Sequence, residues 1–297
     1  METQMAEPEL LIEPQGYSRP SVSLPEKPLL VMVPSKRWVA LDLRSLWTFR
    51  DLLYFLTLRD VKIRYKQTAL GVAWAVLQPL LTMLIFTLFF GRVAKIPSNG
   101  HPYALFAFAG LLPWTFFANA ITNSGNSLVN NAALISKVYF PRLIMPSAAV
   151  LASLVDLAVS LVLMFGLAAF YGVGMSLNIL ALPALILLTT LLALAVSLFF
   201  AALNVKYRDV RYALPFLVQL AMFATPIIYP ISMVPQRWRW ALLLNPMAGL
   251  VEGFRVSLLG GQFDLPGLEL ASAITIILLA LGAYYFRSVE RSFADLI

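Results

Sequence analysis

The sequence lacks cysteine altogether and has one histidine, His101, among its 297 residues. Without cysteine there can be no disulfide and no thiol nucleophile, and a lone histidine excludes a metal site built from several histidines of one chain. The motifs G-x-x-x-x-G-K-[ST] of P-loop nucleotide binding, G-x-S-x-G and H-E-x-x-H are missing too. We therefore expect no catalytic residue, no metal and no cofactor on this chain, and no enzymatic activity.

Charge is also scarce. Only 12% of the residues are Asp, Glu, Lys or Arg, against about 25% in soluble domains, and 60% are hydrophobic. A helix needs about 20 apolar residues to cross a bilayer, and residues 71–91 contain no ionisable side chain. We predict an all-α membrane protein whose transmembrane domain covers 70–290. Its six spans are expected at about 70–91, 103–124, 143–170, 178–204, 212–231 and 268–286.

The basic residues lie beside the apolar stretches, so the net charge of +7 indicates membrane topology and no nucleic-acid partner. Their bias predicts that both ends of the chain are cytoplasmic, including the short end at 291–297. Residues 1–40 are rich in Pro, Glu and Ser, without the pattern of a signal peptide, and we expect a flexible cytoplasmic tail. The basic residues expected inside are Arg59, Lys62, Arg64, Lys66, Lys137, Arg142, Lys206, Arg208, Arg211, Arg287 and Arg291.

Residues 41–69 are predicted to contain an amphipathic helix that lies in the membrane interface among the lipids. Leu46, Phe49, Leu53 and Leu56 recur at helical spacing opposite a polar stripe that ends in the basic run at 62–66. Two interpretations stay open: a simple membrane anchor, or a cuff that also contacts a cytoplasmic partner.

The last external loop, 232–267, contains much apolar sequence but is interrupted by Asn-Pro at 245–246 and Gly-Gly at 260–261. We expect two short re-entrant helices that dip into the outer interface instead of a full span. A further set of aromatic residues is expected to anchor the chain at the outer interface. It comprises Tyr103, Trp114, Phe116, Phe117, Trp238 and Trp240.

Asp156 is the only carboxylate deep inside a predicted span. A charge at that depth costs several kcal/mol, so a partner or water is expected beside it. The carboxylate could serve as a proton or cation site, or it could be a structural group of the bundle. We favour the structural interpretation, because a proton-coupled transporter usually has more than one ionisable group in the membrane.

Polar and aromatic residues share one face of the first span and one face of the fifth. Such faces could line a path for a sugar chain, or they could be ordinary interhelical packing. The candidate lining residues are Gln78, Thr82, Phe86, Phe89, Gln219, Phe223 and Tyr229. The second cytoplasmic loop, 126–142, has apolar residues at helical spacing before Pro141 and could dock a cytoplasmic subunit.

Four segments, in order, resemble the membrane subunits of ABC-2 type polysaccharide exporters, the family that moves O-antigen, capsule or teichoic-acid polymers. The resemblance covers about 45–290 and leaves out the first 40 residues. The segments are LRDVKIRYKQTALGVAWAVLQPL at 58–80, LLPWTFFANAI at 111–121, LISKVYFPR at 134–142 and NPMAGLVEGFR at 245–255.

The resemblance implies a homodimer of this chain on two copies of a separate P-loop ATPase, which would hold ATP and Mg. The substrate would be a lipid-linked glycan on undecaprenyl diphosphate, crossing the bacterial cytoplasmic (inner) membrane. By the same resemblance, the helix at 46–62 is an interface helix, the loop near 128–140 is a coupling helix, and 232–267 is a gate loop. The first and fifth spans would line the channel.

The resemblance also assigns residues to roles. The coupling residues would be Asn131, Leu134, Ile135, Lys137, Val138 and Tyr139. Those of the gate loop would be Trp238, Asn245, Glu252 and Arg255. Arg59, Arg64 and Lys66 could hold the lipid diphosphate, or could simply fix topology. Three rival functions stay open: an ABC-2 exporter of drugs or lipids, a proton-coupled secondary transporter using Asp156, and a membrane scaffold that transports nothing.

Overall fold

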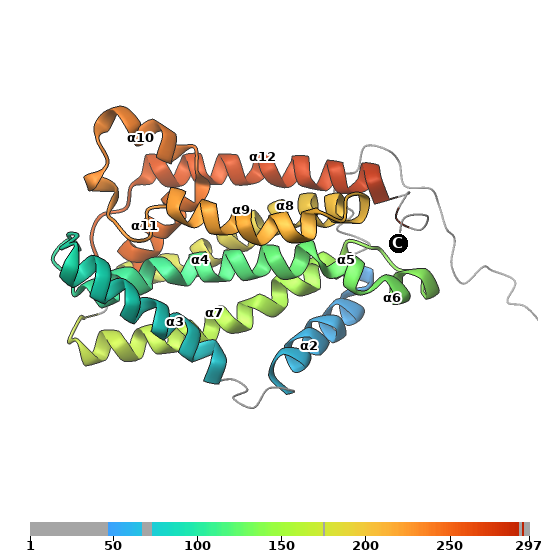
Figure 1. Ribbon diagram of the computed structural model, residues 1–297, viewed down its shortest axis with the longest axis horizontal. Helices are drawn as coiled ribbons and strands as arrows, with labels where there is room; N and C mark the ends of the chain where they lie inside the picture. The colour runs from blue at the N-terminus through green and yellow to red at the C-terminus, as the bar shows by residue number, and fades with distance from the viewer. Residues whose placement is uncertain (1–46, 67–72, 175, 291–292, 294–297) are drawn as a thin grey trace, which may run out of the picture. The chain divides into compact units, whose positions relative to one another are not determined.

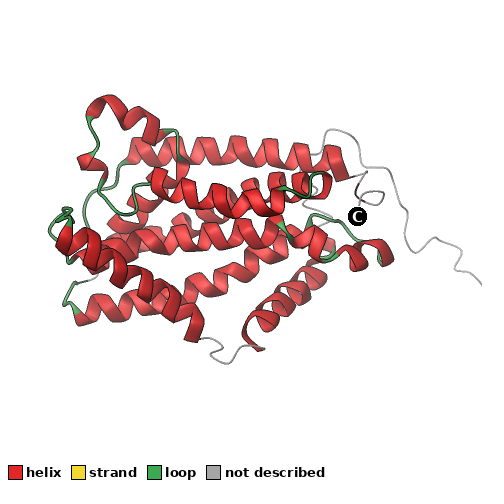
Figure 2. Ribbon diagram, in the orientation of Figure 1, coloured by secondary structure: helices red, strands yellow, loops and turns green. Residues whose placement is uncertain are grey.

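The computed structural model describes residues 47–66, 73–174, 176–290 and 293. Within these residues the chain is helical, with short loops and no strand (Figure 2). The prediction of an all-α protein is confirmed. The expected tail at 1–40 and most of the C-terminal end at 291–297 lie outside the described residues.

The helices follow one another along the chain as labelled in Figure 1. The longer ones are α2 (Arg50–Lys66), α3 (Ala73–Phe86), α4 (Tyr103–Gly125), α7 (Ile144–Phe170), α8 (Leu182–Lys206), α9 (Val210–Ala224), α11 (Pro246–Leu259) and α12 (Leu265–Glu290). The shorter ones are the π-helix Thr87–Val93 that continues α3, α5 (Ser127–Asn130), α6 (Ala132–Lys137), the 3-10 turns Leu177–Ala181 and Ile231–Met233, and α10 (Gln236–Leu243).

In the described part of the chain, five helical segments are long and apolar enough to cross a membrane. They are Val76–Val93, Tyr103–Gly125, Ile144–Phe170, Leu177–Lys206 and Leu265–Glu290. Lengths near the thickness of the hydrocarbon core follow from the apolar runs themselves, since each residue of an α-helix adds about 1.5 Å.

The expected fifth span, 212–231, differs in the structure. Its helix, α9, has 15 residues and ends at Ala224, so it is only about 22 Å long. Thr225 is extended because a residue that precedes proline, here Pro226, is disfavoured in the helical conformation. Helices α10 and α11 are bent by 98° at the break between them. The expectation of two short helices in 232–267 agrees with this bend, and the pair would be a sixth span only if counted as one.

Helix α4 is the centre of the bundle. It contacts α3, α7, α8, α9 and α11, and Figure 1 shows it running between α7 and α8. Trp114, Phe116 and Phe117 are therefore buried in the core, and the prediction that they anchor the outer interface was wrong. An aromatic residue on a helix that other helices surround on several sides faces those helices and not the lipid boundary.

Helix α2 packs along α7 and belongs to a second, smaller hydrophobic cluster. Leu56 is its buried contact, with Phe49 and Leu53 packed beside it. Tyr54 and Phe55 on the other faces stay exposed. An apolar outer face on a short, partly basic helix suits the headgroup region of a bilayer, and the interfacial position of α2 stays a prediction.

Candidate functional site

The carboxylate of Asp156 on α7 has two partners, both from the end of α2. The guanidinium of Arg64 and the hydroxyl of Tyr65 donate hydrogen bonds to its two oxygens. The side chains are mostly buried, with 14% of Asp156 and 29% of Arg64 exposed. The charge in the bundle is thus neutralised by a salt bridge to α2, in agreement with the structural interpretation of Asp156.

Tyr65 is a donor in this arrangement. Burial raises the pKa of its hydroxyl well above the usual value, and the hydrogen bond to Asp156 and the charge of that carboxylate raise it further. The hydroxyl therefore keeps its proton at physiological pH and stays available to the carboxylate.

Three hollows follow one another near this salt bridge, and each shares lining residues with the next. The first, which we call the basic groove, runs along one face of α2 and has a volume of about 350 Å³. None of its described lining residues is a carboxylate. Those residues are Phe55, Leu58, Arg59, Lys62, Ile63 and Lys66.

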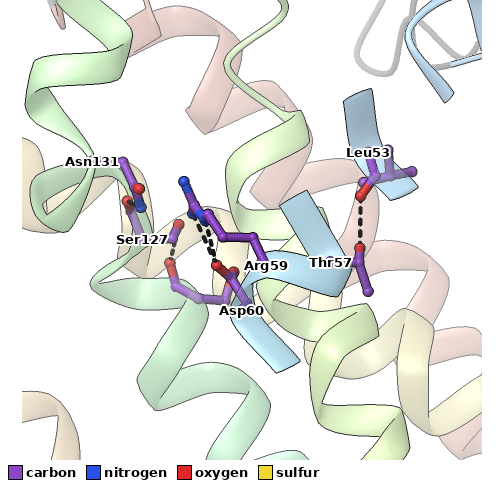
Figure 3. A network of polar contacts seen from close by, with 7 residues as sticks. Leu53, Thr57, Arg59, Asp60, Ser127 and Asn131 are labelled. Atoms are coloured by element: carbon purple, nitrogen blue, oxygen red, sulfur yellow. Dashed lines mark hydrogen bonds and ion pairs between the residues drawn. The ribbon is translucent and has the colours of Figure 1, made fainter. Parts of the chain in front are cut away.

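The second hollow, the amide cavity, has a volume of about 460 Å³ and lies between α2 and the corner where α4 meets α5. Arg59 and Ile63 line both it and the basic groove. Figure 3 shows Arg59 and Asp60 beside Ser127 and Asn131 of that corner, and the guanidinium of Arg59 lies 2.9 Å from the carboxylate of Asp60. The charge of Asp60 is therefore taken up by its neighbour.

The third hollow, the inner cavity, has a volume of about 230 Å³ and is lined by residues of α2, α3, α4 and α7. Arg64 and Asn123 line both the amide cavity and the inner cavity, so the Arg64–Asp156 salt bridge borders the two. The structure thus brings Arg59 and Lys66 to one groove and ties Arg64 to Asp156. The diphosphate role of these three residues stays a prediction.

The candidate lining residues fall into separate sets. Gln78 lines the inner cavity, whereas Phe86 is buried in the core against Phe90. Phe89 on the π-helix and Phe223 on α9 are exposed. Helix α3 packs on α4 and α7, and α9 packs on α4 and α8, so the two predicted faces lie on different sides of α4. Thr82, Gln219 and Tyr229 complete the set; Thr82 and Tyr229 are partly buried and Gln219 is exposed.

The expected coupling helix near 128–140 is two short helices, α5 and α6, joined at Asn131. Ile135 is buried against the bundle and Leu134 packs beside that cluster. Beyond the end of α6 the chain is extended, and the side chains of Val138 and Tyr139 are 51% and 69% exposed. Lys137 is exposed as well. This end of the bundle therefore offers apolar side chains to a partner.

Residues of the expected gate loop form hydrogen bonds with the segment that follows α9. Arg255 on α11 is 3% exposed; its guanidinium lies 3.8 Å from the ring centre of Phe106 and donates to the carbonyl of Ile227 over 2.6 Å. Glu252 accepts a second bond at 3.3 Å. Tyr103 donates to the next carbonyl, that of Ile228. Two backbone carbonyls left without helical partners at the break are thus satisfied by side chains of α4 and α11.

Asn245 also connects α11 to the break after α9. Its side chain accepts a hydrogen bond from the amide of Met247 as the N-cap of α11, and donates to Thr225 over 2.9 Å. Trp238 on α10, in contrast, is exposed. Of the predicted gate residues, Asn245, Glu252 and Arg255 meet near the break and Trp238 does not.

Sequence reasoning missed the polar residues of α4 and of its C-cap that line the amide and inner cavities. They are Thr115, Asn119, Thr122, Asn123 and Asn126. Their spacing of three to four along an otherwise apolar span places them on one helical face, and this spacing was visible in the sequence.

Comparison with known proteins matches the family described as "ABC-2 type transporter" to residues 51–259. The chain is similar to the O-antigen export system permease protein RfbA of Myxococcus xanthus, at 31% identity over 85% of this chain and 97% of that protein. It is also similar to an O-antigen export system permease protein RfbA of Klebsiella pneumoniae, at 30% identity over 83% and 95% of the two chains.

The polysialic acid transport protein KpsM of Escherichia coli shows 24% identity over 80% of this chain and 93% of its own. The family match covers the helical bundle from α2 to α11, which is the part that contains the three hollows and the Arg255 contacts. The chain belongs to the ABC-2 type transporter family, as an integral membrane protein of that family's transport subunits.

Proposed function

We propose that this chain is the permease subunit of an ATP-driven exporter that moves a lipid-linked polysaccharide across the bacterial cytoplasmic membrane. The observation that carries the proposal is similarity to two O-antigen export permeases along nearly their whole length. The similarity to KpsM, a polysialic acid transport protein, points to the same class of substrate. An O-antigen-like glycan on undecaprenyl diphosphate fits these relatives best.

The energy would come from a separate ATPase, since the sequence has no P-loop of its own. Two copies of that ATPase, with ATP and Mg, would bind at the α5–α6 end of a permease homodimer. The exposed Val138 and Tyr139 support docking there, as does the rigid seat of Ile135 in the bundle. Closure of the ATPases on ATP would push on α6 and bias the permease between two states.

The lining of the channel would come from α3 and α9. Both helices expose apolar residues along their length, among them Leu84, Ile85, Phe216 and Phe223. In one chain these faces have only lipid to meet, whereas in a dimer they could face a second copy across a path for the polymer. Both ends of the chain would be cytoplasmic, following the placement of Lys and Arg.

The diphosphate of the carrier would bind in the basic groove. Lys62 and Lys66 lie there together with Arg59, which is also bonded to Asp60, and none of the described lining residues is a carboxylate. A phosphate group pairs well with such donors. Arg64 would act less directly, because it is paired with Asp156. That pairing also weakens the rival proposal of proton coupling through Asp156, since both oxygens of the carboxylate already have partners in Arg64 and Tyr65.

The test is reconstitution of the permease with its ATPase in vesicles, with labelled lipid-linked glycan on the cytoplasmic side. We expect ATP-dependent movement of the glycan that survives an ionophore. Transport that stops with the ionophore and continues without ATP hydrolysis would refute the proposal. Stimulation of the ATPase by a drug or a simple lipid, and not by glycan, would favour another ABC-2 substrate.

Two variants test the assigned regions. Leu134→Pro should uncouple ATP hydrolysis from export while the chain stays in the membrane, and unchanged export would count against docking at α6. Gln78→Trp should block passage of the polymer; normal glycan at the cell surface would remove Gln78 from the path.

A further inference from the structure

Polar side chains form one continuous stripe along α4. Thr115, Asn119 and Asn123 line the inner cavity at a spacing of four residues, and Thr122 and Asn126 continue the lining into the amide cavity. Residues four apart on an α-helix lie one above the other on the same face. The stripe thus runs from the corner at α5 into the bundle, with its amides toward the two cavities.

Some of these groups have partners and some do not. Asn126 donates to the carbonyl of Thr122 and accepts from Asn204, so it belongs to the structure of the corner. In the part of the chain that the structure describes, no hydrogen bond joins the side chains of Thr115, Asn119 or Asn123 to another protein group. An amide in a membrane protein that lacks a partner is costly unless water or a ligand supplies one. These three side chains are available to a polar ligand.

Charge changes in a definite order along the three hollows. The basic groove presents Lys62 and Lys66, with Arg59 shared with Asp60, and its described lining residues include no acid. In the amide cavity, Asp60 is bonded to Arg59. Among the described residues that line the inner cavity, the charged ones are Arg64 and Asp156, whose charges cancel. A ligand that fits this order has an anionic group at one end and uncharged hydrogen-bonding groups next to it.

A sugar has the uncharged hydrogen-bonding groups that the amide and inner cavities would bind. Each side-chain amide offers donors and an acceptor, which suits hydroxyl groups that both donate and accept. The amide cavity, at about 460 Å³, falls in the range of small-molecule sites. Trp74 and Tyr65 border the inner cavity and add aromatic surface for the apolar side of a sugar ring.

We infer that the amide cavity and the inner cavity bind the sugars directly attached to the carrier diphosphate, while the diphosphate lies in the basic groove. The ligand class is a glycosyl diphosphate lipid, recognised by its first sugars as well as by its phosphates. The inference rests on the proposed export of lipid-linked glycan and adds a site that selects the carrier-proximal end. Asn119 and Asn123 are its specificity-determining residues.

The test measures binding of defined probes to the full-length protein in lipid nanodiscs. The probes are farnesyl diphosphate carrying one N-acetylglucosamine, farnesyl diphosphate alone, and inorganic diphosphate. The wild type should bind the glycosylated probe about tenfold or more tightly than farnesyl diphosphate, as expected for one or two extra hydrogen bonds. Equal affinity for the two farnesyl probes would overturn the inference. An affinity for inorganic diphosphate equal to that for the glycosylated probe would overturn it as well.

The variants localise the preference. Asn123→Leu, at an exposed position, should lose most of the preference for the sugar and keep the affinity for farnesyl diphosphate. Asn123→Gln should retain part of it. Gln262→Leu removes an exposed amide far along the chain, in the loop before α12, and should change nothing. A wild-type preference in Asn123→Leu would overturn the assignment.

The outcome separates this inference from the proposed function. If the reconstituted complex exports glycan but the asparagine variants bind every probe as the wild type does, the sugar site is refuted and the exporter stands. If the wild-type complex exports no glycan, the exporter itself is refuted. Should Asn119→Leu fail to fold, the exposed Asn123 still decides the question.

Discussion

Two arginines inside the bundle lie in very different surroundings. Arg255 is almost fully buried and holds the carbonyl of Ile227, a ring face of Phe106 and the carboxylate of Glu252. Arg64 is paired with Asp156 but stays 29% exposed and borders two cavities lined with amides. Both guanidiniums border a hollow, which measures about 440 Å³ beside Arg255, but only Arg64 keeps a sizeable part of its side chain exposed.

The difference shows what a buried charge can be used for. Where the partner is a backbone carbonyl at a helix break, the arginine fixes the path of the chain and substitution should damage the fold. Where the partner is a side chain next to unpaired amides, as for Arg64, the salt bridge forms part of a cavity wall. Substitution of that arginine should weaken ligand binding before it destabilises the fold. Four predictions test this contrast, from the largest expected effect to the smallest.

Arg255→Met should lower the free energy of unfolding by about 3 kcal/mol, because it removes a cation from the face of Phe106 and leaves the carbonyl of Ile227 without its donor. Thermal unfolding in detergent would measure the loss. Arg255→Lys keeps the charge but not the forked set of donors, so its free energy of unfolding should lie between those of the wild type and Arg255→Met. A variant as stable as the wild type would show that the break at Thr225 is held by other contacts.

Gly110→Ala should disturb the same arginine from the opposite side. A Cβ at Gly110 would lie 2.8 Å from the guanidinium of Arg255 and 3.3 Å from the carbonyl of Ile227, so one of them must move, at a cost of about 2 kcal/mol. Gly166→Ala on α7 is the matched control, since nothing lies within 4 Å of its added Cβ. Equal melting temperatures for the two variants would contradict the close packing around Arg255.

Asp156→Asn should cost about 1.5 kcal/mol, between the values for exposed and buried ion pairs, because Arg64 is partly open to solvent. The loss should be local, seen as faster hydrogen exchange of the α2 amides while α4 stays protected. The reversed pair Arg64→Asp with Asp156→Arg should recover part of the protection. Uniform exchange across the bundle would mean that the pair supports the whole fold, as Arg255 does.

Tyr65→Phe should have the smallest effect, under about 1 kcal/mol, since it removes one hydrogen bond to Asp156. Burial, with the hydrogen bond to Asp156, raises the pKa of Tyr65 above its ordinary 10.0. The unfolded chain therefore loses this proton first, and stability falls as pH rises above about 10. The slope of melting temperature against pH in that range should be shallower for Tyr65→Phe than for the wild type.

The sequence alone predicts the helical class, most of the spans, a helix before the first span and the pair of short helices in the last loop. These follow from apolar runs whose length the bilayer dictates. It fails where a residue's surroundings come from distant parts of the chain. Trp114 is buried because α4 is central, and α9 ends early because Pro226 follows Thr225.

The candidate site divides in the same way. The cations of α2 could be named from the sequence because they stand in one helical stripe. The pairing of Arg64 with Asp156 joins residues 92 positions apart, which periodicity cannot reveal. The amides at Asn119 and Asn123 had a visible spacing, but only the packing of α2, α3 and α7 around α4 shows that they face a cavity.

The central place of α4 has a consequence for how such a protein can change. One side of this helix is filled by Trp114, Phe116 and their neighbours, and another side carries the stripe of amides. A substitution among the polar residues of α4 that changes the preferred polymer would therefore also risk disturbing the packing on the other side of this helix. We expect new specificities to arise through side chains of α2 and α3 that border the amide and inner cavities, while α4 stays unchanged.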